Sequence, residues 1–129
     1  MNGNKLALDT NQAIAILNRE DEARKIQTFT EIYLPVPVVG ELRFGALNSQ
    51  KSEANLERIS HLVNRCHAVG INLDTAEIYA RIRLHLKQKG RPIPENDLWI
   101  AAICVQHAIP LATADDHFSA IEELTVIDW

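Results

Sequence analysis

The sequence lacks the short motifs that mark several common classes of enzyme. Its five glycines form neither GxGxxG nor GxxxxGK[ST], so we expect no dinucleotide or P-loop nucleotide site. There is no CxxC or HExxH segment, and the five histidines show no zinc-ligand spacing, which argues against a zinc site. There is also no GxSxG segment of the kind that holds a nucleophilic serine.

Long apolar runs and abundant cysteine are also absent. No stretch reaches the about 18 apolar residues of a membrane-spanning helix, and the only apolar run in residues 1–10 is too short for a secretory leader. The two cysteines, Cys66 and Cys104, lie far apart in apolar segments. We expect them to be buried thiols rather than a disulfide, as in a protein of the reducing cytoplasm.

The composition is that of one globular domain. The chain has 129 residues, of which 47% are hydrophobic and 23% charged, and its net charge is −4. A chain of this size can bury a substantial core, and it is too apolar to be disordered. Proteins that bind phosphate backbones are usually basic. A nucleic-acid partner would therefore need another source of positive charge, which a bound divalent cation can supply.

Short apolar segments alternate with helical ones along the chain. The pattern predicts strands at 5–9, 32–36, 71–73, 109–112 and 125–127. It predicts helices at 12–19, 20–30, 37–48, 51–68, 75–89, 95–107 and 116–124. We expect a three-layer α/β/α sandwich with a central, mostly parallel sheet, formed by a single domain of residues 1–129.

Acidic residues recur where apolar segments end or begin. Asp9 closes the first predicted strand, and Asp115 and Asp116 follow the fourth. Asp97 lies in the first turn of the most apolar helix, and Glu41 lies in an apolar helical segment where it should be half-buried beside a small polar face. Each has a purely structural explanation. The aspartates can cap helices or be stabilised by the helix dipole at a helix N-terminus, and the glutamate can be exposed to solvent.

Taken together, these acids suggest a site. In a parallel sheet, ligands bind beyond the carboxyl ends of the strands, so three or four carboxylates would meet at one edge. Uncompensated carboxylates repel one another, and Mg²⁺ or Mn²⁺, which prefer oxygen ligands, relieve that repulsion. The sequence therefore predicts a carboxylate–metal site, for which phosphoryl chemistry is the natural use.

A basic stretch accompanies the acids. Five cations with no acid between them lie within eleven residues: Arg81, Arg83, Lys87, Lys89 and Arg91. Such a stretch can contact a phosphate backbone, or it can be an ordinary solvated helix face.

Four segments, in this order, resemble the PIN-domain family, and specifically its VapC-like ribonuclease toxins of type II toxin–antitoxin systems. They are LDTN at 8–11, VGELRFG at 39–45, PIPENDLWIAA at 92–102 and LATADDHF at 111–118. The third is the most specific. The four together extend over nearly the whole chain.

The resemblance implies a metal-dependent endoribonuclease that uses Mg²⁺ or Mn²⁺. It implies that Asp9, Glu41, Asp97 and Asp115 are the catalytic, metal-binding acids, with Asp116 a possible substitute for Asp115. Asn11 and Thr113 would be supporting polar residues, and the basic stretch would bind RNA. The implied partners are RNA, a cognate VapB-like antitoxin and a second copy of the chain, with no membrane.

Three other functions remain open from the residues alone. One is a PIN-like nucleic-acid-binding or interaction protein with weak or no nuclease activity. Another is a non-enzymatic domain whose acids only cap helices. The third is a phosphatase or related phosphoryl-transfer enzyme, although the only lysine near Asp9 is Lys5.

Overall fold

The computed structural model describes residues 4–19, 24, 29 and 31–128. A parallel sheet in the order β3-β2-β1-β4-β5 runs through the middle of the protein. Its strands are β1 (Lys5–Leu8), β2 (Glu31–Pro35), β3 (His67–Val69), β4 (Leu111–Thr113) and β5 (Val126–Asp128). The expected parallel sheet is confirmed.

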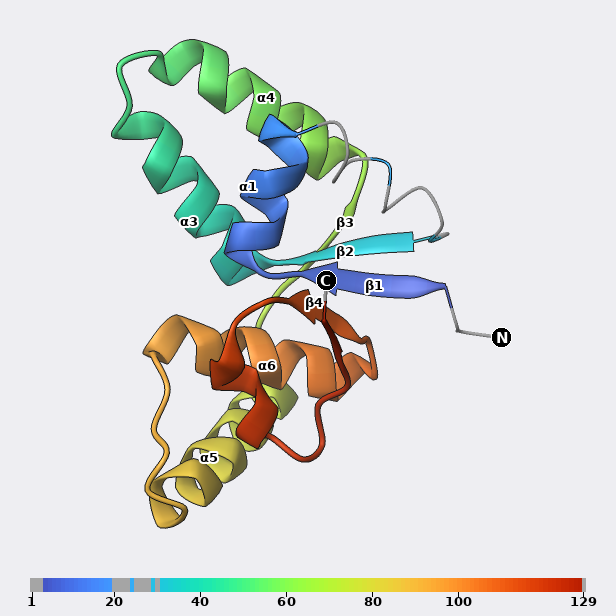
Figure 1. Cartoon of the computed structure of the whole chain (residues 1–129), viewed down its shortest axis with the longest axis vertical. Coiled ribbons are helices and arrows are strands. Elements are labelled where there is room, and N and C mark those ends of the chain that lie inside the picture. Colours follow the sequence, from blue (N-terminus) through green and yellow to red (C-terminus); the bar gives the residue numbers. More distant parts are fainter. Residues whose placement is uncertain (1–3, 20–23, 25–28, 30, 129) are drawn as a thin grey trace.

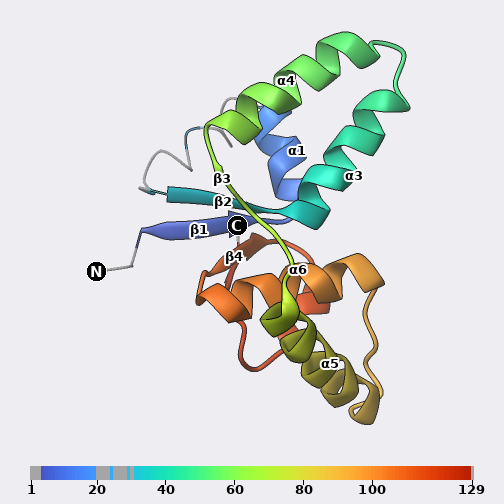
Figure 2. The ribbon, with the colours of Figure 1, turned by 180° about the vertical axis from the view of Figure 1, so that it is seen from behind.

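Helices cover both faces of this sheet. One face carries α1 (Thr10–Asn18), α3 (Val36–Leu47) and α4 (Ser52–Asn64), and the other carries α5 (Leu73–Gln88) and α6 (Glu95–His107). The two groups lie on opposite sides of the strands in Figures 1 and 2. This is the predicted three-layer arrangement.

The central strand β1 sets the position of the site. Its side chains Leu6 and Leu8 are fully buried between the helical layers. It pairs with β2 on one side and with β4 on the other, with Ala7 opposite both Tyr33 and Leu111. Because the three strands are parallel, their carboxyl ends lie at one edge of the sheet, and the residues that follow them meet there.

The predicted strand at 71–73 is wrong. The third strand is instead His67–Val69, and Asn72 begins α5. The Asn72 side chain accepts a hydrogen bond from the backbone N–H of Thr75, and the Thr75 hydroxyl accepts one from the backbone N–H of Asn72. This reciprocal capping favours a helix start over a strand.

Two predicted helices are shorter in the structure. The helix predicted at 51–68 ends at Asn64, because residues 67–69 pair with β2 as an edge strand. The helix predicted at 116–124 is a short 3₁₀ helix, η2 (Asp116–Ala120), which is anchored by the buried ring of Phe118. Most of the helix predicted at 20–30 lies outside the described residues.

Both cysteines are free thiols in apolar surroundings. Cys104 is buried and Cys66 is half-buried. Burial raises the pKa of Cys104 to about 12 and that of Cys66 to about 11. Neither thiol is therefore a ready nucleophile at neutral pH. In the described part of the chain, no helix has the length and apolarity to cross a membrane.

Candidate active site

Asp9 stands at the carboxyl end of β1 and begins α1. One carboxylate oxygen, Oδ1, accepts a hydrogen bond of 2.9 Å from the backbone N–H of Gln12 and so caps the helix. The other oxygen, Oδ2, accepts a hydrogen bond from the hydroxyl of Thr113, the last residue of β4. Asp9 is 6% exposed, so these two bonds hold a buried carboxylate between two strand ends.

Asp97 and Asp115 meet on the other side of this edge. Asp97 projects from the first turn of α6, and Asp115 begins η2. Between them lies the imidazole of His117, whose Nδ1 is 3.2 Å from Asp97 Oδ2 and 3.2 Å from Asp115 Oδ1. The backbone N–H of Asp115 donates to Thr113 Oγ1 at 3.0 Å, so Thr113 connects this group to Asp9.

Glu41 reaches the site from α3. Its Oε1 accepts a hydrogen bond of 2.8 Å from the hydroxyl of Thr10, the first residue of α1. The expectation that Glu41 is half-buried is wrong, because its side chain is exposed. It does border a cavity of about 240 Å³ together with Gly45, between α1, α3 and α4. Next to it, Asn96 and Phe44 line a more open cleft.

The four acids influence one another electrostatically. Burial raises the pKa of Asp9, and the charges of Asp115 and Glu41 raise it further, against the hydrogen bonds from Thr113 and Gln12. Burial also raises the pKa of Asp97, with Asp115 and Glu41 again adding to the rise, while contact with His117 lowers it. The negative charges of Asp115 and Glu41 thus make Asp9 and Asp97 harder to ionise, and a cation at this place would relieve that cost.

The donor atoms fit a hard divalent cation. Asp97, Asp115 and His117 each offer one ligand atom, and the three atoms lie within 4.8 Å of one another. Asp9 and Glu41 lie outside this group of three, but the charge of Glu41 is near enough to raise the pKa of both Asp9 and Asp97. A set of carboxylates with at most one imidazole fits Mg²⁺ or Mn²⁺ better than a soft, thiol-binding ion.

The remaining predicted polar residues lie at the rim. Asn11 and Asp116 line an open cleft of about 480 Å³ together with Asp9, Asp115 and His117. Asp115, and not Asp116, contacts His117. Because His117 also contacts Asp97, its ring connects the two aspartates. Asp116 is exposed, and its backbone carbonyl accepts a hydrogen bond from Ser119.

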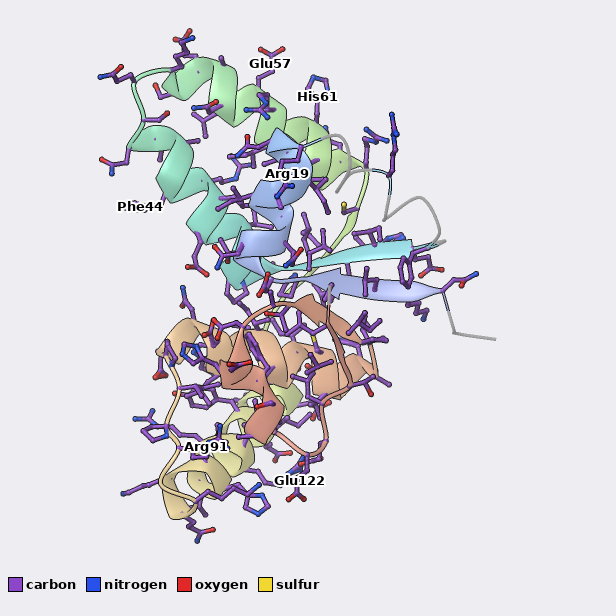
Figure 3. The ribbon with its side chains drawn as sticks, viewed as in Figure 1. Arg19, Phe44, Glu57, His61, Arg91 and Glu122 are labelled. Carbon is purple, nitrogen blue, oxygen red and sulfur yellow. The ribbon has the colours of Figure 1, made fainter. Side chains whose placement is uncertain are left out.

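Most of the predicted basic stretch is paired with acids of this chain. Arg81 lies 2.9 Å from Glu123, and Lys89 lies 3.2 Å from Glu122. Arg83 pairs at 3.6 Å with Glu95, the first residue of α6. Lys87 and Arg91 are exposed and have no ion-pair partner among the described residues. Figure 3 shows Arg91 at the α5 end of the molecule.

Sequence reasoning missed two members of this site. His117 stands in the fourth motif. The histidines have no zinc-ligand spacing, so their pattern does not mark His117 as a residue of the site. Its position two residues after Asp115 was the available signal. Thr10 stands in the first motif, but its hydrogen bond to Glu41 joins residues 31 apart in sequence, so the motif does not indicate this contact.

Comparisons with known proteins show the family to which this chain belongs. The family model of the PIN domain matches residues 6–124. Ribonuclease VapC5 of Mycobacterium tuberculosis is 36% identical over 67% of this chain and 66% of its own length. Ribonuclease VapC2 of Rickettsia felis is 26% identical over 95% of this chain and 96% of its own length.

Solved structures share the fold over nearly the whole chain. The complex VapBC2 from Rickettsia felis, bound to a promoter DNA fragment, contains a chain with a TM-score of 0.91 and 25% identity, covering 97% of this chain and 98% of that one. FitAcB from Neisseria gonorrhoeae gives a TM-score of 0.80 at 29% identity, covering 95% and 96%. The chain therefore belongs to the PIN domain family, and it has relatives named VapC ribonucleases.

Proposed function

We propose that this protein is the toxin of a type II toxin–antitoxin pair and acts as a metal-dependent endoribonuclease that hydrolyses phosphodiester bonds in RNA. One observation carries the proposal. Acidic side chains from four separate segments come close enough that Asp115 and Glu41 raise the pKa of both Asp9 and Asp97. A folded protein that concentrates carboxylates in this way gains from binding a cation there.

Asp9, Glu41, Asp97 and Asp115 would hold Mg²⁺ or Mn²⁺. When bound, the ion lowers the pKa of a coordinated water and offsets the charge of the phosphate. The chain itself supplies the positioning. Thr113 fixes the Asp9 carboxylate through its hydroxyl, and Thr10 fixes that of Glu41.

The proposed substrate and partner follow from the relatives. Proteins named ribonucleases are 36% and 35% identical to this chain over 67% and 71% of it. The chains of similar fold come from VapBC and FitAB complexes, so we infer a VapB-like antitoxin as partner. A homodimer of this chain is part of the same proposal.

The test is RNA cleavage by the full chain, purified free of any antitoxin. With total RNA and Mn²⁺ or Mg²⁺ we expect discrete cleavage that EDTA abolishes. We expect Asp97→Asn to lower the rate by at least about a hundredfold, because it removes one metal-binding carboxylate. Asp74→Asn is the matched control, since Asp74 is an exposed acid in the first turn of another helix, α5.

Two results would contradict the proposal. Cleavage that persists in EDTA would exclude a metal-dependent mechanism. A folded protein that neither cleaves RNA nor binds Mn²⁺ would instead be an interaction domain whose acids serve only as helix caps.

A further inference from the structure

His117 lies in the middle of the acidic site. Its Nδ1 is 3.2 Å from Asp97 Oδ2 on α6 and 3.2 Å from Asp115 Oδ1 at the start of η2. It is the one nitrogen donor in the described cluster of three possible metal ligands. An imidazole held between two carboxylates from separate elements needs an explanation beyond the packing of η2.

The chain around His117 fixes the ring in this place. The backbone N–H of His117 donates to Asp115 Oδ1 at 3.0 Å, and the next residue, Phe118, is 1% exposed and anchors η2 in the core. The His117 side chain is 47% exposed, compared with 21% for the Asp97 side chain and 32% for that of Asp115. His117 and Asp115 also line an open cleft, so a cation can approach this group from solvent.

The two contacts of Nδ1 have the spacing of neighbouring ligand atoms around a metal ion. In octahedral coordination with bond lengths of about 2.1 Å, adjacent ligand atoms lie about 3 Å apart. Both contacts of Nδ1 are close to this value. The 3.2 Å contact with Asp97 Oδ2 also allows Nδ1–H to donate a hydrogen bond to that carboxylate when no ion is bound.

We propose that His117 is a ligand of the divalent cation through Nδ1, together with Asp97 and Asp115. This inference rests on the proposed function, because it assigns a further residue to the same site. Mg²⁺ takes oxygen ligands, whereas first-row transition ions also accept imidazole. A nitrogen ligand at this position therefore favours Mn²⁺ over Mg²⁺.

The competing explanation is that His117 only orients Asp97 through a hydrogen bond. His117→Asn separates the two roles. The asparagine amide reaches about as far as Nδ1 and can donate the same hydrogen bond, but it offers no imidazole nitrogen to a metal. His107→Asn is the matched control, because His107 is an exposed histidine at the C-terminal end of α6, whereas Asp97 lies in the first turn of that helix.

The experiment is pulsed electron paramagnetic resonance of Mn²⁺ bound to the full chain. We expect an echo modulation from a directly bonded nitrogen in the wild type and in His107→Asn, and none in His117→Asn. Labelling the wild type with ¹⁵N-histidine should change the modulation, which identifies the bonded nitrogen as that of a histidine, and the loss in His117→Asn then identifies which one. In titrations, the Mn²⁺ to Mg²⁺ affinity ratio should fall at least about tenfold in His117→Asn.

The outcomes separate this inference from the proposed function. Bound Mn²⁺ without nitrogen coupling in the wild type would overturn the role of His117, while RNA cleavage in the same preparation would keep the proposed function. Nitrogen coupling in a protein that cleaves no RNA would keep the ligand assignment and overturn the proposed function. A wild type that binds no Mn²⁺ would overturn the role of His117, and the absence of RNA cleavage with either ion would then overturn the proposed function as well.

Discussion

Asp9 uses its two carboxylate oxygens for two different structural purposes. Oδ1 caps α1 through the Gln12 N–H, and Oδ2 accepts the Thr113 hydroxyl bond that links β1 to β4. The two interpretations of Asp9 from the sequence, helix cap and site residue, are therefore compatible. Capping holds the carboxylate in the place where a cation needs it.

Holding this carboxylate ionised is costly in the metal-free protein. Burial and the nearby charges of Asp115 and Glu41 raise the native pKa of Asp9. A carboxyl with a raised native pKa binds its proton more tightly in the folded than in the unfolded state. Its stabilising effect is therefore present at low pH and is lost as the pH rises through the native pKa.

Asp9→Asn removes this charge and keeps the cap, because asparagine caps helices as well as aspartate does. In EDTA at neutral pH we expect the free energy of unfolding to rise by about 1 kcal/mol. We also expect the stabilisation by added Mn²⁺ to shrink, because a ligand that binds the folded state raises its stability. Urea unfolding with and without Mn²⁺ measures both.

Asp74→Asn controls for the general effect of removing an acid near a helix start. It should change neither the stability in EDTA nor the response to Mn²⁺. If Asp9→Asn destabilised the metal-free protein instead, the cost of keeping this buried carboxylate ionised would not be the dominant effect.

At the scale of single elements, strands and helices could be predicted well where the local sequence alone determines the structure. The helix at 95–107 was predicted with its observed bounds, because its apolar run begins after Pro94 and includes Asp97 in the first turn. The third strand was misplaced because His67–Val69 is held by pairing with β2, and its own residues are exposed or half-buried.

Part of the site could likewise be predicted from local sequence patterns, and part of it could not. Asp9 and Asp115 could be found because they follow strand ends, and parallel strands bring those ends together. The exposure of Glu41 and the place of His117 could not, because they depend on how α3 and η2 pack against other elements. Local patterns do not carry this information.

The start of α5 can be tested by mutation. Asn72 caps this helix, whereas the sequence pattern predicts a strand at 71–73. Asn72 exchanges hydrogen bonds with Thr75 and also accepts one of 3.0 Å from Gln106 on α6. Asn72→Ala removes the side-chain cap and leaves the buried Thr75 without this partner. We expect a loss of about 1–2 kcal/mol in the free energy of unfolding.

Urea unfolding measures this loss, with Asn64→Ala as the control. Asn64 is an exposed asparagine at the end of α4, so its replacement should stay within about 0.5 kcal/mol. Equal effects of the two substitutions would mean that the Asn72 cap contributes nothing specific.

For the whole molecule, the question is how a chain with a net charge of −4 would hold RNA. The proposed cation answers it at the active site, where the acids are gathered. Within the basic stretch, the positive charge is largely neutralised, since Arg81, Arg83 and Lys89 pair with glutamates. Lys87 and Arg91 keep their charge available for a phosphate backbone, as far as the described residues show.

We therefore expect that removing the unpaired cations of the basic stretch weakens RNA binding more than removing the paired ones. In an Asp97→Asn background, which prevents cleavage, Lys87→Ala with Arg91→Ala should weaken binding. It should also lower the slope of log affinity against log salt by about 0.7 for each phosphate that the protein no longer neutralises. Fluorescence anisotropy over a series of salt concentrations measures this slope.

The control for this prediction is Arg81→Ala with Lys89→Ala in the same background. It removes the same charge, but its cations already pair with Glu123 and Glu122, so the slope should change less. Equal slopes for the two double variants would mean that RNA follows a path away from this end of α5.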